Sequence, residues 1–215
     1  MNKEDKMTAL MIDKARKMTD LHRARTRINE DPEDFMKALR FADYHHRNQV
    51  RKYTFMPYIT HPIAVARKVS ELIGKIVYVT DKTVAAALLH DVVGDCDVTN
   101  QDIADIFGTA MAAVVADLTD PDKVEGVNRA ARKVIIRNRY QNDACLEACI
   151  IKLCDLWHNH ISIEKYDPKF AKQYNIEREE LEAVSPMKLV KSMILERAPH
   201  FFDVPLEFQY HKDRG

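Results

Sequence analysis

The stretch Val84-Ala-Ala-Ala-Leu-Leu-His-Asp-Val-Val93 decides the fold that the sequence predicts. Alanine and leucine are strong helix formers, so the uncharged run that opens this stretch predicts a buried helix. His90 and Asp91 stand at the end of the run. A histidine and an aspartate are costly to bury unless they are paired or bind a metal. The stretch therefore predicts a helical core with a polar site at its edge.

The rest of the chain follows the same helical pattern. Apolar residues recur at helical spacing, and capping residues with prolines mark helix starts at Asp31-Pro32, Asp167-Pro168 and Ser185-Pro186. The pattern predicts roughly nine helices, a further apolar stretch over 110–118 and an irregular segment over 45–57. The predicted helices span residues 7–29, 31–44, 60–73, 82–93, 99–108, 127–142, 143–163, 167–184 and 185–199.

Three details of these helices are specific enough to check. Asp81 is expected to cap the helix that contains the opening stretch. Thr99 and Asp102 form a capping-box pair, and Gly108 is the expected end of the helix that they begin. The apolar face of the helix that starts at Thr60 is predicted to consist of Ile63, Ala66, Val69 and Ile73.

The chain shows no convincing strand, no internal repeat and no low-complexity linker. The predicted fold class is therefore all-α, with a single compact multi-helix domain. We expect an N-terminal helical extension over residues 1–30, the domain itself over 31–199 and a C-terminal tail over 200–215. The amphipathic pattern from Met7 to Leu21 leaves open a homo-oligomer in which this helix contacts a second copy.

Composition excludes several classes of protein. Only 5 of the 215 residues are glycine, so positions for positive backbone φ are few, and tight β-hairpins, Rossmann loops and P-loops are disfavoured. Lys and Arg together number 33, as do Asp and Glu, so no global basic field points to a nucleic-acid partner. The longest apolar run, Ala110 to Ala116, is too short to span a bilayer, and the first residues lack a signal peptide. We expect a cytoplasmic protein with no membrane partner.

The four cysteines predict neither a disulfide framework nor a zinc site. Cys145, Cys149 and Cys154 lie in one predicted helix among apolar residues, and Cys96 stands apart from them. Cysteines in such surroundings usually act as small buried hydrophobic residues, and this interpretation is favoured here.

Three further polar residues, Asp155, Asn159 and His61, belong with His90 and Asp91 in one candidate site. Asp155 stands among apolar residues in its helix, and Asn159 follows four residues later on the same face. His61 lies in the first turn of another helix. Two imidazoles and two carboxylates from three helices are suited to one divalent metal, such as Mn²⁺, Fe²⁺, Zn²⁺ or Mg²⁺.

Each of these residues also has a purely structural interpretation. His61 with Pro62 is a common helix start, and His90 with Asp91 is a common paired end of a helix. Asp155 has a partner within reach in Lys152. Taken singly, each residue favours the structural role, and it is their order along the chain that favours a functional site.

Separated stretches of the chain carry the motifs of a known family in the right order. The stretches are residues 38–46, 49–52, 57–62, 85–93, 99–108, 118–120 and 151–159. Together they resemble the HD-domain metal-dependent phosphohydrolases, and within them the hydrolase domain of the RelA/SpoT family and the small stand-alone SpoT-homologue hydrolases. The resemblance covers about residues 35–181 and implies the HD-domain fold without a synthetase domain.

The resemblance implies a role for each candidate residue. Arg51 and Lys52 would contact the nucleotide or its phosphates, and Asn159 would contact the sugar or orient a metal ligand. Tyr174 would line the pocket near the 3′-pyrophosphate, although ordinary core packing explains it equally well. One metal, typically Mn²⁺, would be bound by His61, His90, Asp91 and Asp155.

One position departs from the family pattern. After its His-Asp pair the family has two residues and then Glu-Asp, whereas this chain has Val92, Val93, Gly94 and Asp95. The family's acidic pair is thought to handle a proton, a contribution worth about 10²–10⁴-fold in rate. Asp95 is therefore the expected catalytic residue. The missing side chain at Gly94 makes space for a larger substrate, and the missing carboxylate is also consistent with a protein that binds its nucleotide and hydrolyses it slowly.

The leading functional prediction is metal-dependent hydrolysis of guanosine 3′,5′-bis(pyrophosphate), ppGpp or pppGpp, which yields GDP or GTP and pyrophosphate. Three alternatives stay open. One is an HD phosphohydrolase that acts on NADPH, a dNTP or a nucleoside monophosphate. Another is an alarmone-binding protein with impaired catalysis, and the last is a helical interaction protein with a relict site.

Overall fold

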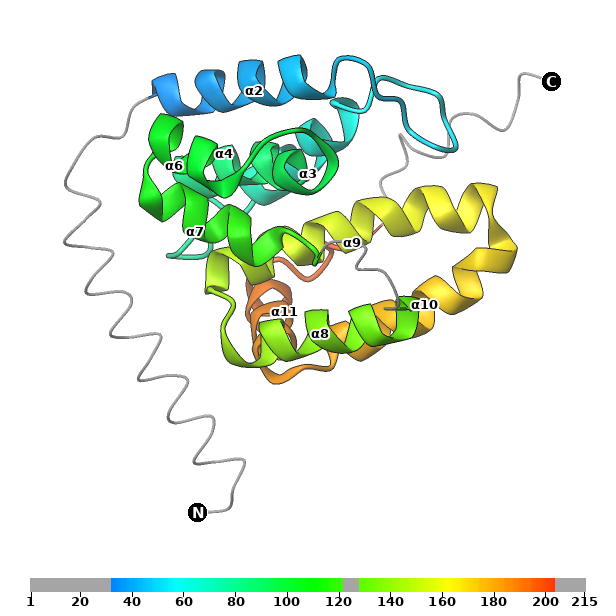
Figure 1. The fold of residues 1–215 in the computed structure, drawn as a ribbon. Helices are drawn as coiled ribbons and strands as arrows, with labels where there is room; N and C mark the ends of the chain where they lie inside the picture. The colour runs from blue at the N-terminus through cyan, green and yellow to red at the C-terminus, as the bar shows by residue number, and fades with distance from the viewer. Residues whose placement is uncertain (1–31, 122–127, 204–215) are drawn as a thin grey trace. The chain divides into compact units, whose positions relative to one another are not determined.

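The computed structural model describes residues 32–121 and 128–203. Within these ranges every regular element is a helix, and an isolated bridge between Val50 and Pro57 is the one β feature (Figure 1). The predicted all-α fold class is confirmed. The helices are α2 (Pro32–His46), α3 (Thr60–Ser70), α4 (Asp81–Leu89), α5 (Val92–Asp95), α6 (Asn100–Phe107), α7 (Thr109–Leu118), α8 (Arg129–Asn142), α9 (Leu146–Tyr166), α10 (Pro168–Glu182) and α11 (Ser185–Arg197).

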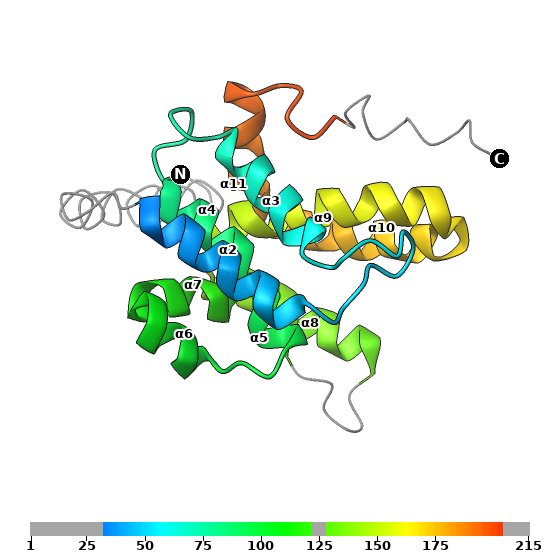
Figure 2. The same cartoon turned by 90° about the horizontal axis from the view of Figure 1, so that it is seen from above.

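Helix α9 is the element against which most of the others pack. Every residue from Ala148 to Trp157 is buried except Lys152, which is half-buried. Helices α3, α4, α7, α10 and α11 all contact α9. Figures 1 and 2 show α10 running back along α9 after the turn that joins them. Each fully buried Leu or Ile side chain contributes about 1.5–3 kcal/mol, so α9 supplies a large part of the core.

Most of the predicted helix ends are present. The hydroxyl of Thr99 accepts a hydrogen bond from the backbone N–H of Asp102, whose carboxylate accepts one from the N–H of Thr99 at 2.8 Å, so the capping box is confirmed. Gly108 ends α6 with φ +89°, a conformation that favours glycine. The prediction for Asp81 was wrong, because Thr80 occupies the cap position in extended backbone geometry and its N–H donates to Thr83 Oγ1 at 3.1 Å.

The helix predicted over 82–93 is interrupted. Helix α4 ends at Leu89, and the four-residue α5 begins at Val92. Between them, the Nδ1 of His90 donates to the carbonyl of Ala87 at 2.8 Å. This side-chain bond to the preceding turn orients His90, whose Nε2 lies 2.9 Å from Asp91 Oδ2, so both polar side chains meet in one place.

The predicted apolar face of α3 was partly wrong. Ala66 and Val69 are buried, but Ile63 is 43% exposed and Ile73, beyond the end of the helix, is 44% exposed. The buried face instead includes His61 and Val65. Ile63 is rotated by ~200° from His61 at 3.6 residues per turn, so burial of the histidine directs Ile63 to solvent.

Two of the four cysteines are buried as the sequence predicted, whereas Cys96 and Cys145 are half-buried. All four are free thiols, and Cys149 and Cys154 are buried in α9. Burial raises the pKa of the Cys149 thiol to about 12, which keeps it protonated and unreactive. Cys145 lies at the cap position of α9, and the helix therefore begins three residues later than its predicted start at residue 143.

The ordered core continues past the last helix. Phe201 is buried against the core, and the indole N–H of Trp157 donates to the carbonyl of Phe202 at 3.0 Å. The predicted first helix and most of the predicted tail lie outside the described residues, so the proposed contact between residues 7–21 and a second copy remains a prediction. No helix in the described ranges combines the length and the apolar character needed to cross a membrane.

Two neighbouring residues provide a test of the observed packing. Leu72 is fully buried, whereas Ile73 is 44% exposed. We expect Leu72→Ala to lower the free energy of unfolding by about 2–5 kcal/mol, because it removes buried methyl groups and leaves a cavity. We expect Ile73→Ala to change it by less than about 1 kcal/mol. Urea denaturation followed by circular dichroism measures both, and equal losses would contradict the observed orientation.

Candidate active site

Three side chains from α3, α4–α5 and α9 converge in the core. His61 lies in the first turn of α3, His90 directly follows α4, and Asp155 lies in the buried half of α9. The Nε2 atoms of the two histidines are 3.3 Å apart, and Asp155 Oδ1 lies 3.2 Å from His61 Nε2. All three residues are at least 95% buried. The structure thus brings together three of the four residues predicted to bind a metal.

The fourth predicted ligand, Asp91, lies directly beside the two histidines. Its Oδ2 atom is 2.9 Å from His90 Nε2 and 3.4 Å from His61 Nε2. Burial alone lowers the pKa of His90, but the carboxylates of Asp91 and Asp155 outweigh burial and raise it to about 9. Burial likewise raises the pKa of Asp91, yet His90 and His61 hold it well below its usual range. The charges of this cluster therefore stabilise one another.

A second layer of side chains orients the two histidines. The carbonyl of Ala87 accepts from His90 Nδ1, so the Nε2 of His90 points into the cluster. The Nδ1 atoms of His61 and His158 are 2.7 Å apart. Burial, together with His61 and Arg51, lowers the pKa of His158 to about 3, so His158 is neutral at pH 7. A neutral His158 can accept from His61 Nδ1, and this contact keeps His61 Nε2 directed at Asp155.

Asp155 is held at both carboxylate oxygens. Asn159 donates to Oδ1 at 2.6 Å, and the Lys152 ammonium lies 3.0 Å from Oδ2. Lys152 also approaches Asp120 at 3.9 Å. Burial raises the pKa of Asp155, but Lys152 and His61 outweigh it and lower the pKa below its usual range. Asp155 is therefore a fixed, negatively charged group.

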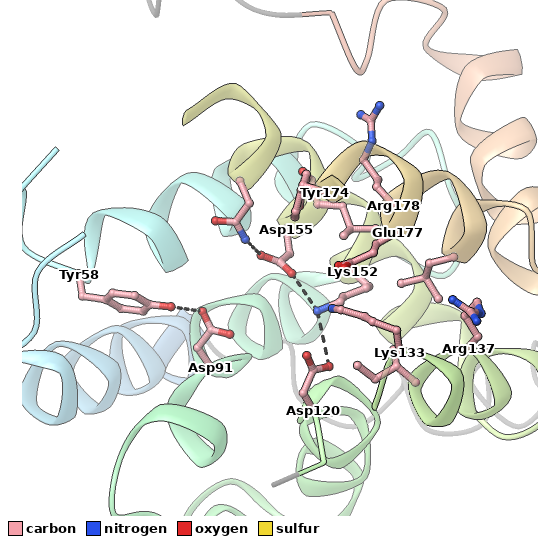
Figure 3. A pocket seen from close by; sticks show the side chains of 14 residues that line it. Tyr58, Asp91, Asp120, Lys133, Arg137, Lys152, Asp155, Tyr174, Glu177 and Arg178 are labelled. Carbon is pink, nitrogen blue, oxygen red and sulfur yellow. Dashed lines mark hydrogen bonds and ion pairs between the residues drawn. The ribbon is translucent and has the colours of Figure 1, made fainter. Parts of the chain in front are cut away.

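A cavity of about 210 Å³ opens beside this cluster. Figure 3 shows it with Tyr58 and Asp91 at one end, Arg137 and Arg178 at the other, and Lys152 and Asp155 between them. Lys133 lies in its wall, and no hydrogen bond or ion pair joins it to another described residue. Burial lowers the pKa of Lys133, as expected for a cation without a close partner. The other basic side chains of the lining, Arg137, Lys152 and Arg178, have carboxylate partners, and the lining also includes Asp91, Asp120, Asp155 and Glu177. An anionic group of a ligand would therefore pair with Lys133.

Only two of the other predicted site residues line the cavity. Asn159 and Tyr174 line it, and the Tyr174 hydroxyl donates to the carbonyl of Leu156 at 3.1 Å. Arg51 does not line the cavity but donates to Asn159 Oδ1 at 2.9 Å, which links it to the cluster. The Lys52 side chain is 74% exposed and lies 3.8 Å from Asp167. The Asp95 carboxylate lies 3.0 Å from the hydroxyl of Tyr58.

The donor atoms fit a divalent metal. Two imidazole nitrogens and carboxylate oxygens form a borderline-to-hard ligand set, and one atom each from His61, His90 and Asp155 lie within 4.8 Å of one another. Among the described residues this is the one such group of His, Cys, Asp and Glu side chains. The thiols take no part in it, so the set matches oxygen- and nitrogen-preferring metals.

Three residues of this region have no role in the predictions from sequence. Tyr58 contacts two carboxylates, His158 contacts His61, and Lys133 lines the cavity. Tyr58 and His158 lie inside the family motifs of residues 57–62 and 151–159. This location is the one feature of the sequence that could have indicated a role for them. Lys133 is one of several partly buried basic residues in α8, and helical periodicity alone does not distinguish it from the others.

Comparison with known proteins identifies the family of this fold. The HD domain family model matches residues 38–184. The bifunctional (p)ppGpp synthase/hydrolase SpoT of Escherichia coli is 36% identical over 166 residues, which cover 73% of this chain and 22% of SpoT. The chain thus spans about a fifth of the length of that relative.

A shorter relative matches over most of its own length. The guanosine-3′,5′-bis(diphosphate) 3′-pyrophosphohydrolase MESH1 of Danio rerio is 33% identical over 135 residues, which cover 62% of this chain and 71% of MESH1. The solved structure of a metazoan orthologue of SpoT has the same fold, with a TM-score of 0.61, 24% identity and coverage of 79% of this chain and 98% of that one. By its helices, its buried histidine–aspartate cluster and these matches, the chain belongs to the HD-domain family.

Proposed function

We propose that this protein hydrolyses the 3′-pyrophosphate of guanosine 3′,5′-bis(pyrophosphate), yielding GDP or GTP and pyrophosphate. The observation that carries the proposal is the convergence of His61, His90 and Asp155 beside a cavity lined by Lys133 and Lys152. A divalent metal and cationic walls are what a polyphosphate substrate requires. SpoT and MESH1, whose names give this activity, support the choice of substrate.

We infer one divalent metal, with Mn²⁺ as the first candidate and Fe²⁺, Zn²⁺ or Mg²⁺ as alternatives. His61, His90, Asp91 and Asp155 would hold it. When bound, such a metal polarises a phosphate oxygen and lowers the pKa of a water molecule. Ala87 and His158 keep the two histidines oriented toward this position, and Lys152 and Asn159 do the same for Asp155.

The remaining residues bind substrate and handle a proton. Lys133 lies where it can neutralise phosphate oxygens in the cavity. Arg51, held by Asn159, and the exposed Lys52 do not line the cavity, and they are proposed to contact the part of the nucleotide that extends beyond it. Burial and the nearby Asp91 raise the pKa of Asp95, which suits a carboxyl group that gives a proton to a leaving group. Tyr174 is proposed to line the pyrophosphate end.

Several features of the whole protein stay predictions. These are the domain limits at residues 31 and 199, a cytoplasmic location and the formation of a homo-oligomer. The family match over residues 38–184 lies inside the proposed domain.

A nucleotide panel tests the proposed function directly. Full-length protein with Mn²⁺ is expected to release pyrophosphate and GDP from ppGpp, measured by anion-exchange chromatography, faster than it acts on NADPH, dGTP or GMP. EDTA should abolish the release and added Mn²⁺ should restore it. Protein that is fully loaded with metal but releases no pyrophosphate from ppGpp would refute the proposal, and cleavage of another nucleotide would redirect it.

Replacing Asp155 tests the metal site. We expect Asp155→Asn to lose most of its bound Mn²⁺ and to lower hydrolysis by about 100-fold or more, since a bound metal is worth several kcal/mol to the reaction. Metal analysis after gel filtration measures the first effect. Asp105→Asn is the matched control, because Asp105 is exposed on α6 and contacts Gln101. Metal content equal to the wild type in Asp155→Asn would contradict the assignment.

Lys133 offers a test of the cavity as the phosphate site. Removal of a hydrogen bond to a charged group costs about 1.5–3 kcal/mol, so we expect Lys133→Met to raise the KM for ppGpp by about 10- to 100-fold. Lys172→Met is the control, because Lys172 is an exposed lysine of α10 that does not line this cavity. A KM unchanged by Lys133→Met would place the phosphates elsewhere.

Gly94 distinguishes the enzyme from an alarmone-binding protein with impaired catalysis. A Cβ atom built at Gly94 meets one atom, Thr119 Cγ2 at 3.9 Å, so a side chain fits there. If Asp95 supplies the acid, Gly94→Glu should change kcat by less than about 10-fold, as should Gly94→Gln. A gain of about 10²-fold or more with glutamate alone, in a stopped-time ppGpp assay, would instead favour the impaired binder.

A further inference from the structure

Tyr58 contacts two carboxylates of the site, although the proposed function gives it no role. Its hydroxyl lies 2.7 Å from Asp91 Oδ2 and 3.0 Å from Asp95 Oδ2. The same Asp91 oxygen lies 2.9 Å from His90 Nε2. Tyr58 therefore connects the candidate metal cluster to the carboxylate proposed to give a proton, and it also lines the cavity, as Figure 3 shows.

The surrounding chain fixes the ring of Tyr58. Its backbone N–H donates to the carbonyl of Gln49 at 2.9 Å, and the adjacent bridge joins Val50 to Pro57. The ring lies 4.7 Å from the buried imidazole of His46, with an interplanar angle of 33°. These contacts position the hydroxyl before any ligand binds.

The same segment also holds Asp95. The side-chain amide of Gln49 donates to the backbone carbonyl of Asp95 at 2.7 Å. Gln49 thus binds Tyr58 through its own carbonyl and Asp95 through its side chain. Gln49 therefore links the phenol and this carboxylate directly, in addition to their connection along the chain through α3 and α4.

We propose that Tyr58 is a positioning residue that couples Asp91 to Asp95 through one shared hydroxyl group. This inference rests on the proposed function for its effect on hydrolysis, but its structural part concerns the cluster alone. A phenol carries a single proton, so the two carboxylates compete for it, and the shorter contact gives Asp91 the stronger bond. When Asp91 is engaged as a ligand, the hydroxyl can turn to Asp95 and hold that carboxyl beside the cluster.

Tyr58→Phe tests the shared hydroxyl, because it keeps the ring against His46 and removes one oxygen. Loss of an outer partner of a metal ligand typically costs 10- to 100-fold, so we expect the Kd for Mn²⁺ to rise by about 10-fold in isothermal titration. We expect kcat on ppGpp to fall by about 10- to 100-fold, with KM changed by less than about 3-fold. Tyr140→Phe is the control, since it removes a buried tyrosine hydroxyl that has no hydrogen-bond partner among the described residues. Mn²⁺ affinity and kcat both equal to the wild type would overturn the proposal.

A double-mutant cycle separates coupling from a general structural effect. Asp95→Asn is expected to lower kcat by more than Tyr58→Phe, because it also removes the proposed acid. At saturating Mn²⁺ the double variant should be within about 3-fold of Asp95→Asn, because the hydroxyl then acts on kcat through Asp95. Losses that multiply would show independent roles and contradict the coupling.

The two measurements also separate this proposal from the proposed function. Wild-type protein that binds Mn²⁺ but leaves ppGpp intact refutes the proposed substrate, and the Mn²⁺ titration of Tyr58→Phe still decides the structural role. Thermal unfolding by circular dichroism confirms that each variant is folded. If Tyr58→Phe does not fold, the effect of Asp95→Asn on Mn²⁺ affinity replaces it: a 2- to 10-fold change supports the coupling through the hydroxyl, and no change refutes it.

Discussion

The structure depends on the burial of three ionisable groups in a helical core, beside a fourth that is partly exposed. His61, His90 and Asp155 are almost fully removed from water, and Asp91 lies against both histidines. Such burial is tolerated only when the charges neutralise one another and every polar atom has a partner. Lys152 and Asn159 are the partners of the Asp155 carboxylate, and Ala87 and His158 are the partners of the histidine Nδ1 atoms. The core around α9 is therefore organised by an electrostatic requirement as much as by apolar packing.

The polar cluster coincides with departures from the local sequence pattern. A continuous helix over residues 82–93 would satisfy local propensity, yet α4 ends at Leu89, and His90 and Asp91 lie in the interruption and contact the cluster. Burial of His61 likewise rotates α3 and leaves Ile63 exposed. Local sequence preferences were overruled at the positions where the polar site is assembled, and they held elsewhere, as at the Thr99–Asp102 capping box.

The sequence predicted the fold class, most helices and the residues that meet in the core. The sequence did not predict contacts between residues that are distant along the chain, because hydrophobic periodicity gives no signal for such contacts. Lys133 looks like any other basic residue of α8 until the fold directs it into the cavity, and Tyr58 gains its two carboxylate partners only through the turn held by Gln49. Arg51 was expected beside phosphate, and the structure shows the Asn159 contact through which it is held.

The spacing of the cluster along the chain has a consequence for biosynthesis. His61 and His90 are made long before Asp155, and the last of these residues lies in the middle of α9. Because α9 is also the helix on which α3, α4 and α7 pack, the nascent chain has neither a finished core nor a complete ligand set until that helix has left the ribosome. The complete set of residues proposed to hold the metal would therefore be available only after synthesis of α9.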